Sequence, residues 1–349
     1  MPICDIAPPR NSLVSFHYFG SFDLDRLSNL RLIGDSGAYS ARMQGIEISN
    51  DDLGKWAQKW QHRLAWVASM DIAGDTAKTR YNWEAITKGY GIPAVSSLHM
   101  GTPPEEMDWY AEQGVDFLGL GGVAGGTASK DAVFRWLISV FKYAQKNHPQ
   151  MRFHGWGITA QSWIRLPFFS VDSSSWGSSY RYGQLILRDP RTFKRVTMTL
   201  NGRDVYNPRN AKLLSNHYGV APSEVSLSKP DNRHKIVRLS ALSASLQEKQ
   251  MRRMHPTISH PKWGVLGGAS GMPDGPHIHL AEGHHKHLEY VDELALTGDV
   301  SGPVLHDELP DGPHMHLAEA SIPNLVNLNQ MAGGEEPLPV SDLRESVVE

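Results

Sequence analysis

The chain has 349 residues, a net charge of −3 and a hydrophobic fraction of 40%, values typical of a soluble globular protein with one large domain or two ordinary ones. No run of about 18 apolar residues occurs, and the first ten residues lack a basic-then-apolar leader pattern, so we expect no membrane span and no secretion. Cys4 is the only cysteine. It excludes an intrachain disulfide and a cysteine-based zinc site, and it favours a cytoplasmic, intracellular setting.

Short apolar segments alternate with amphipathic ones over the first half of the chain. Helices are expected at 52–65, at 103–113 after the N-cap residue Thr102, and at 130–147 after the N-cap residue Ser129. Repeated alternation predicts a parallel sheet. The strand candidates are LVSFHYF (13–19), LRLIG (30–34), AWVASM (65–70), PAVSSL (93–98), DFLGLG (116–121), RFHGWG (152–157) and FFSVD (168–172). Seven candidates in so short a stretch favour an α/β fold of the (β/α)8 TIM-barrel type over an open doubly wound sheet.

The second half of the chain changes character twice. Residues 183–203 predict a hairpin that turns at Asp189-Pro190, and residues 208–255 predict basic helices. Residues 203–262 hold 11 basic against 4 acidic side chains, whereas residues 263–349 hold 2 against 15. We therefore expect a barrel over 1–202, a basic helical extension over 203–262 that completes or flanks it, and a flexible, His- and acid-rich tail over 263–349.

The tail contains an internal repeat and many histidines. PDGPHIHLAE (273–282) and PDGPHMHLAE (310–319) differ at one position of ten, and nine of the 17 histidines fall in 260–316. His-x-His pairs such as His277 with His279 and His314 with His316 can bind zinc, so a metal hydrolase is one alternative. The glycines and prolines around them instead favour a loose segment with no metal site.

Acids, a histidine and glycines stand where the predicted strands end. Functional groups of a (β/α) barrel gather at the carboxyl ends of its strands. Asp35, Asp71 and Asp172 would then share one end of the barrel with His99 and the glycines after residue 120. The alternative for each aspartate is structural, since Asp favours turns and helix N-caps.

Five of these segments, in order, resemble motifs of the tRNA-guanine transglycosylases. DSGAY (35–39) is similar to that family's Asp-Ser-Gly-Gly-Tyr/Phe signature, and MDIAGD (70–75) to its base-reading aspartate segment. GGVAGG (121–126) and HGWG (154–157) resemble its glycine loop and the strand that follows, and SVDSSSW (170–176) resembles its nucleophile segment. The chain departs from the family in two ways: it cannot build the zinc site, and a strict alignment puts Ser175 in the nucleophile's column. It most resembles the DpdA-type deazapurine DNA-modification transglycosylases of phages and genomic islands.

The resemblance implies a base exchange in which guanine in DNA is replaced by a preQ0-type 7-deazaguanine. It implies Asp172 as the nucleophile and Asp35 as the acid/base group, without a metal or redox cofactor. The base would be held by Ser36, Tyr39, Asp71, His99 (or Met100), Gly121, Gly122 and Gly155.

DNA is the expected partner, because a guanine inside a duplex must be flipped out and phosphate contacts offset that energy. The candidate nucleic-acid contacts are Arg233, Lys235, Arg238, Arg252 and Arg253. A homodimer or accessory modification proteins are further possible partners, in a host cytoplasm if the protein is phage-encoded. A transglycosylase that acts on tRNA and a barrel that binds nucleic acid without catalysis remain as alternatives.

Overall fold

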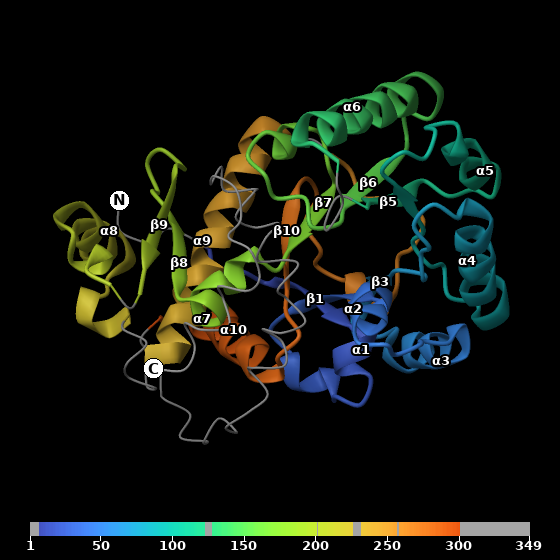
Figure 1. Cartoon of the computed structure of the whole chain (residues 1–349). Helices are drawn as coiled ribbons and strands as arrows, with labels where there is room; N and C mark the ends of the chain where they lie inside the picture. Colours follow the sequence, from blue (N-terminus) through green and yellow to red (C-terminus); the bar gives the residue numbers. More distant parts are fainter. Residues whose placement is uncertain (1–6, 123–127, 201, 226–231, 257, 301–349) are drawn as a thin grey trace, which may run out of the picture. The chain divides into compact units, whose positions relative to one another are not determined.

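A parallel sheet of eight strands lies at the centre of the protein in the computed structural model (Figure 1). The model describes residues 7–122, 128–200, 202–225, 232–256 and 258–300. In chain order the strands are β1 (Asn11–Ser15), β2 (Arg31–Asp35), β3 (Leu64–Val67), β4 (Ser97–His99), β5 (Phe117–Gly121), β6 (Arg152–Gly155), β7 (Ser170–Ser173) and β10 (His277–Ala281). Their order in the sheet is β3-β2-β1-β10-β7-β6-β5-β4. The expected α/β class with a parallel sheet is therefore confirmed.

The sheet curls so that its edge strands β3 and β4 approach each other. No ladder joins them, but Ala68 and Val95 form one isolated parallel bridge just beyond β3. Val95 donates its backbone N–H to Val67 O at 2.8 Å and accepts one from Ser69 N at 3.0 Å. The sheet is thus a half-barrel whose edges touch through this single bridge.

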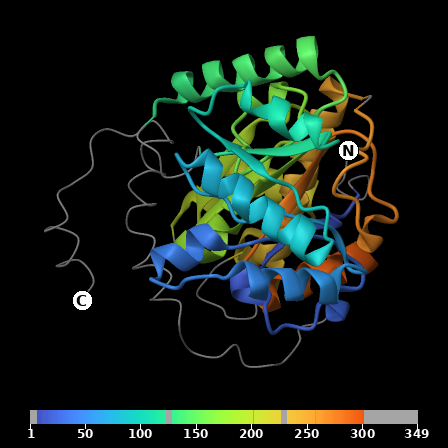
Figure 2. The same ribbon diagram turned by 90° about the vertical axis from the view of Figure 1, so that its right-hand side faces the viewer.

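Helices cover the outer face of the sheet. In Figure 2, α4 (cyan) crosses in front of the sheet between α3 (blue) and α6 (green). α6 begins where the Ser129 side chain accepts a hydrogen bond from Ala132 N, and it buries Val133, Leu137 and Val140. None of the described helices is long and apolar enough to cross a membrane. The helices are α1 (Phe16–Phe19), α2 (Ala38–Met43), α3 (Asn50–Trp60), α4 (Thr76–Tyr90), α5 (Glu106–Glu112), α6 (Lys130–Asn147), α7 (Ser178–Tyr182), α8 (Pro208–Tyr218), α9 (Arg233–Met254) and α10 (His285–Thr297).

Short 3-10 helices connect several of these elements. They are η2 (Leu24–Leu27), η3 (Trp163–Arg165), η4 (Ser175–Gly177), η5 (Asp204–Tyr206), η6 (Pro222–Val225) and η8 (Gly267–Ala269).

The expected hairpin is confirmed as a separate antiparallel sheet of two strands. β8 (Gln184–Arg188) pairs with β9 (Arg195–Thr199) along their full length. Phe193 sits in the turn with φ of 57°, and Tyr218 of α8 donates its hydroxyl to Arg188 O at 2.8 Å. The hairpin packs against α7 and α9, so β8, β9 and α8 form a small layer beside the curled sheet (Figure 1).

Residues 263–300 correct the expectation of a loose tail that begins at residue 263. β10 lies between β1 and β7 in the middle of the sheet, with Ser12 opposite Leu280 and Asp172 opposite His279. The strand looks polar in the sequence because histidines occupy its inward positions, while Ile278 and Leu280 are buried against the helices. The second copy of the repeat, at 310–319, lies outside the described residues.

The first strand candidate is also corrected, since β1 ends at Ser15 and Phe16–Phe19 form the short helix α1. The inside of the curl has a core of its own, built from alternate strand residues such as Leu13, Ile33 and Trp66 with Phe117 and Phe169. Three fully buried histidines share this interior, at positions 154, 277 and 279. The interior is therefore polar on the side of β6, β7 and β10.

Candidate functional site

Asp35 ends β2 and is bound by the turn that follows it. Its Oδ2 accepts a hydrogen bond from Gly37 N at 2.9 Å. Burial, together with the negative charges of Asp71 and Asp172, raises the pKa of Asp35 to about 7, although the backbone donors of the turn act to lower it. Of the carboxylates predicted from the strand ends, Asp71 and Asp172 thus lie close enough to Asp35 to affect its charge. At neutral pH Asp35 is divided between its acid and its carboxylate form.

Gly37 is the residue that makes this turn possible. Its φ is +72°, and a Cβ there would lie 2.2 Å from Ser15 Oγ and 2.5 Å from the Cβ of His17. No L side chain fits without a shift of the backbone. The glycine of DSGAY is therefore required because Ser15, at the end of β1, and His17 leave no space for a side chain at this position.

We expect Gly37→Ala to lower the free energy of unfolding by about 2–4 kcal/mol, because it adds a clash with the backbone neighbourhood to the strain of a positive φ. Gly45→Ala is the matched control, since Gly45 has a φ of +70° and open space around it. The control is expected to lose only about 1 kcal/mol. Urea unfolding followed by circular dichroism measures both, and equal losses would refute the steric argument.

Asp172 lies inside β7 and points into the curl beside β6. Its Oδ1 accepts hydrogen bonds from Gly157 N at 2.8 Å and from His154 Nε2 at 3.3 Å. The other ring nitrogen of His154, Nδ1, lies 2.8 Å from Ser170 Oγ. Burial lowers the pKa of His154, so a neutral ring held by Ser170 fixes the Asp172 carboxylate. Oδ2 of Asp172 has no hydrogen-bond partner among the described residues.

This position excludes the interpretation of Asp172 as a helix N-cap. A helix N-cap precedes its helix, whereas Asp172 is a strand residue, and η4 begins only at Ser175 after Ser174. Ser175, the residue in the nucleophile's alignment column, hydrogen-bonds through its hydroxyl to Ser173 Oγ at 2.7 Å. Asp172 is thus the carboxylate of this segment with an unoccupied oxygen in the interior.

Asp71 and His99 form a pair at the ends of β3 and β4. His99 Nε2 lies 2.7 Å from Asp71 Oδ2, and the other ring nitrogen, Nδ1, is buried without a partner among the described residues. A cavity of about 10 Å³, room for about one water molecule, lies beside His99, Ser97 and Thr79. The structure therefore brings together the two residues predicted to read the base.

Trp156 is a site residue that the sequence reasoning missed. Its indole N–H donates to Ser97 Oγ at 2.9 Å, and its ring meets that of His154 edge-on at 4.3 Å between centroids. A Cβ on Gly119 would lie 2.1 Å from Trp156 Nε1, and one on Gly121 3.1 Å from its Cδ1. Two glycines on the same face of one strand were the signal that a large ring lies across them.

The structure gives Gly121 and Gly155 packing roles that the sequence reasoning did not foresee. Gly121 accepts a backbone hydrogen bond from Met100 N at 2.9 Å and makes room for the indole. A Cβ on Gly155 would lie 3.0 Å from both Ile158 and Phe168. Both glycines therefore make room for neighbouring side chains, and their predicted contact with a base stays a prediction.

The remaining predicted base-binding residues differ in accessibility. Ser36 is buried, and its hydroxyl accepts a hydrogen bond from Ala38 N at 3.3 Å at the start of α2. Tyr39 is 44% exposed, which leaves its ring free to stack on a ligand. Gly122 has a φ of +73° and follows β5. Residues 123–127 of the glycine loop lie outside the described residues.

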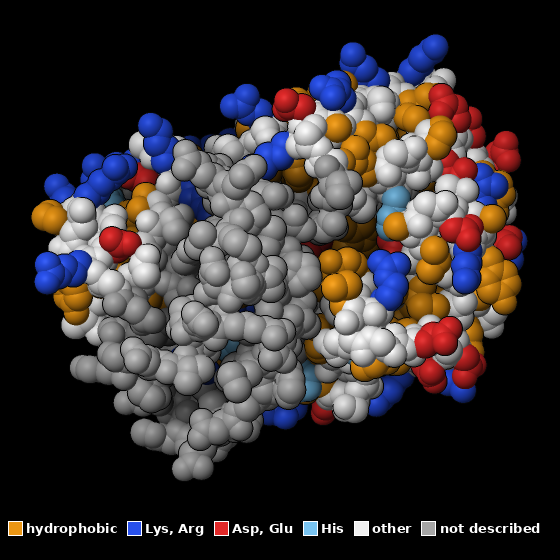
Figure 3. Space-filling model, viewed as in Figure 1, with side chains coloured by type: hydrophobic (Ala, Val, Ile, Leu, Met, Phe, Trp, Pro, Cys, Tyr) orange, Lys and Arg blue, Asp and Glu red, His pale blue; other side chains and the backbone are white. Residues whose placement is uncertain are grey.

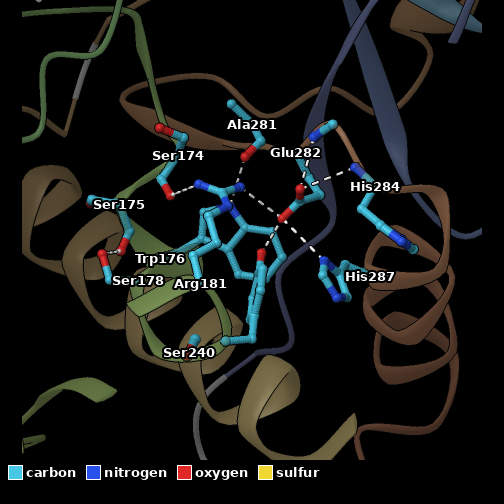
Figure 4. Close-up of polar contacts among 12 residues, drawn as sticks. Ser174, Ser175, Trp176, Ser178, Arg181, Ser240, Ala281, Glu282, His284 and His287 are labelled. Carbon is cyan, nitrogen blue, oxygen red and sulfur yellow. Dashed lines mark hydrogen bonds and ion pairs between the residues drawn. The ribbon is translucent and has the colours of Figure 1, made fainter. Parts of the chain in front are cut away.

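A second polar cluster, also missed by the sequence reasoning, lies where β10 ends (Figure 4). Glu282 accepts hydrogen bonds from Gly283 N at 2.8 Å and His284 N at 3.0 Å. Its other oxygen binds the Tyr180 hydroxyl and, at 2.9 Å, Arg181 Nη2.

Figure 4 also shows His287 turned toward the same carboxylate, with its Nδ1 3.5 Å from Glu282 Oε2. Burial alone would raise the pKa of Glu282, but the positive charge of Arg181 and the contacts with His287 and Tyr180 together outweigh it and hold the pKa well below its usual range. Both oxygens of Glu282 are therefore occupied. The carboxylate ties the turn after β10 to α7 and has no oxygen left for a reacting group.

Helix α9 contradicts one of the five predicted nucleic-acid contacts and gives three others a partner within the protein. Arg238 is fully buried and pairs with Glu293 of α10, so it cannot reach a ligand. Lys235 pairs with Glu224, and Arg252 with Glu248 at 3.2 Å. Arg253 lies over the ring of Phe193 at 4.9 Å. Charge counting along the sequence could not show these partners, and within the described part of the chain Arg233 is the member of this set without such a contact.

No group of three or more His, Cys, Asp or Glu side chains is placed to hold a metal ion within the described part of the chain. His277 and His279 are buried inside the sheet, and His314 and His316 lie outside the described residues. Comparisons with protein families, with curated sequences and with solved structures find no match.

Proposed function

We propose that the protein is a base-exchange transglycosylase that replaces guanine in DNA with a preQ0-type 7-deazaguanine through a covalent glycosyl-aspartate intermediate. The observation that carries this proposal is the contrast between Asp35 and Asp172. Asp35 has a pKa of about 7, whereas Asp172 is fixed by Gly157 N–H and His154 with one oxygen open. Two carboxylates in different environments are what a double displacement at a glycosidic carbon needs.

The two steps follow from these environments. In the first, an oxygen of the Asp172 carboxylate attacks C1′ of the deoxyribose, the C1′–N9 bond to guanine breaks, and protonated Asp35 gives its proton to the departing base. In the second, the Asp35 carboxylate takes the N9 proton of the 7-deazaguanine. That nitrogen attacks C1′, and the bond from C1′ to Asp172 breaks. Two inversions keep the sugar configuration, and both carboxyl groups return to their starting states.

Asp71 and His99 would read the base in this scheme. The free oxygen of Asp71 can accept from the N1–H and the 2-amino group of a guanine-like ring. His99 is oriented by its 2.7 Å contact with Asp71, which leaves its Nδ1 for the ligand or a water molecule. Tyr39 would stack its exposed ring on the base, and the ring of Trp156 would close off the interior of the sheet next to His154.

The finer description of the fold belongs to the same proposal. We propose that the curled sheet is a (β/α)8 barrel of the TIM type, with the bridge between Ala68 and Val95 marking the closure of β3 on β4. In such a barrel the carboxyl ends of all strands form one mouth. Asp35, Asp71, His99 and Asp172 would then belong to one active site, in keeping with the effect of Asp71 and Asp172 on the pKa of Asp35.

The test is an analysis of nucleosides. The protein is expressed in cells that make preQ0, and plasmid DNA and tRNA are digested separately and examined by mass spectrometry. The expected result is a 7-deazaguanine deoxynucleoside that is lost with Asp172→Ala. A modified ribonucleoside in tRNA alone would replace DNA by tRNA as the substrate, and neither product, with preQ0 confirmed in the cells, would refute the exchange.

A further inference from the structure

The surface formed by β9, η5 and α8 carries an excess of positive charge that is not paired with acidic side chains within the described part of the chain. Residues 188–212 hold seven basic and two acidic side chains. Six of the basic residues are exposed, and none of the six forms an ion pair or donates a side-chain hydrogen bond within the described part of the chain. These six, called here the hairpin cations, are Arg191, Lys194, Arg195, Arg203, Arg209 and Lys212.

The two acids of this segment are used locally. Asp189 accepts hydrogen bonds from the backbone of Arg191 and Thr192 in the hairpin turn. Asp204 accepts one from Thr199 N. The buried Arg188 adds to the positive charge of this surface. Burial and then the charge of Arg195 lower its pKa to about 10, but at neutral pH the guanidinium still carries its proton. Figure 3 shows the resulting blue side chains at the left edge, over β9 and α8.

The surface also offers contacts other than charge. Tyr206 is 58% exposed and stands between Arg203 and Arg209 in the sequence. The outward positions of β9 carry Thr197 and Thr199 beside Arg195. Arginines, lysines, hydroxyls and an open aromatic ring are the groups that bind phosphates, sugars and bases of nucleic acids.

The hairpin is tied to the end of the sheet that holds Asp172. Arg188 Nη1 donates to Gln161 Oε1 at 3.2 Å, and Gln161 lies in the segment that follows β6. In that same segment Thr159 Oγ1 donates to Ser173 Oγ at 3.2 Å, at the end of β7. Only η4 and α7 separate Asp172 from β8 along the chain.

We infer that the hairpin cations form the surface that holds the phosphate backbone of duplex DNA beside the site of base exchange. The choice of DNA rests on the proposed function, but the location of the surface rests on the exposed, unpaired cations alone. This surface replaces α9 as the nucleic-acid contact.

The experiment measures binding of a fluorescein-labelled 30-base-pair duplex to the full chain by anisotropy, from 50 to 300 mM salt. Arg191→Gln, Lys194→Gln and Arg195→Gln are combined in one variant. The matched control combines Arg135→Gln, Lys142→Gln and Lys146→Gln, three exposed cations on α6. Far-ultraviolet circular dichroism confirms that both variants fold.

The hairpin variant is expected to bind about 10–100-fold more weakly at 100 mM salt, and its plot of log affinity against log salt is expected to be shallower by about 2–3, because each lost phosphate contact removes about 0.9 from the slope. The α6 variant is expected to stay within about threefold of the parent. Equal losses in both variants, no loss in the hairpin variant, or no binding of DNA by the parent at 50 mM salt would each overturn the inference.

A parallel titration with tRNA distinguishes the source of the phosphates. Tighter, hairpin-dependent binding of tRNA would overturn duplex DNA as the ligand. Binding is measured without the incoming base, so it is independent of exchange. DNA binding that depends on the hairpin cations, without nucleoside exchange, would refute the proposed function and support the DNA-binding surface. Exchange that survives in the hairpin variant, with unchanged DNA binding, would support the proposed function and refute the surface.

Discussion

Asp172→Asn is expected to lower the rate of base exchange by about 10⁴-fold or more, because an amide in place of the attacking carboxylate cannot form the glycosyl ester. Asparagine has the same shape and keeps an oxygen for the hydrogen bond from Gly157 N, which lies 2.8 Å from Oδ1 in the parent protein. Folding should therefore be close to unchanged. The rate is measured as modified deoxynucleoside formed per enzyme, by mass spectrometry of a digested duplex.

The covalent intermediate gives this prediction a second readout. With DNA and no incoming base, the parent protein is expected to form a protein–DNA adduct that survives denaturing electrophoresis, and Asp172→Asn is expected to form none. Ser175→Ala is the matched control, since Ser175 occupies the alternative position in the alignment and its hydroxyl contacts only its own turn. A Ser175→Ala variant that loses the adduct, or an Asp172→Asn variant that keeps it, would assign the nucleophile elsewhere.

Much of the sheet was predictable because most of its strands are short apolar segments that alternate with amphipathic helices. The central strand β10 was not predictable for two physical reasons. Its inward positions are His277 and His279, which look polar although they are fully buried. Its partner β1 lies far away in the sequence, with Ser12 opposite Leu280, and local patterns carry no information about such a pairing.

The residues of the candidate site likewise include some that the sequence predicted and some that it could not predict. Asp35, Asp71, His99 and Asp172 were found because a parallel sheet brings the ends of its strands together. Trp156 and Glu282 were missed because their roles depend on what lies across from them, two glycines of β5 in one case and Arg181 in the other. The prediction of nucleic-acid contacts on α9 was limited for the same reason. Which basic side chains of α9 are buried or paired depends on the elements that pack against the helix, such as α10, and not on the charges of its own sequence.

Asp35→Asn is expected to make the protein more stable at pH 8 while it lowers base exchange by about 10²–10⁴-fold. The pKa of Asp35 rises from its ordinary value of 3.8 to about 7 in the folded protein. Below about pH 4 the group is protonated in both states and contributes nothing. Between pH 4 and 7 only the unfolded chain loses the proton, so the free energy of unfolding falls as the pH rises.

Above pH 7 the parent protein carries the whole penalty of a buried carboxylate beside Asp71 and Asp172, about 4 kcal/mol at most. Asparagine is uncharged at every pH and removes this penalty, so the stability gain of Asp35→Asn should grow from pH 4 to pH 8 and then level off. Urea unfolding across that range measures it, with Glu112→Gln, an exposed carboxylate on α5, as the control that should show no such trend.

A variant that is less stable than the parent at pH 8 would mean that the carboxylate form of Asp35 is favoured by its surroundings, and Asp35 could not then act as the acid at neutral pH. A catalytic carboxylate whose charge is unfavourable in its buried position should show both effects: its replacement raises stability and strongly lowers exchange. The acid/base role of Asp35 thus depends on the same burial that makes its charge unfavourable.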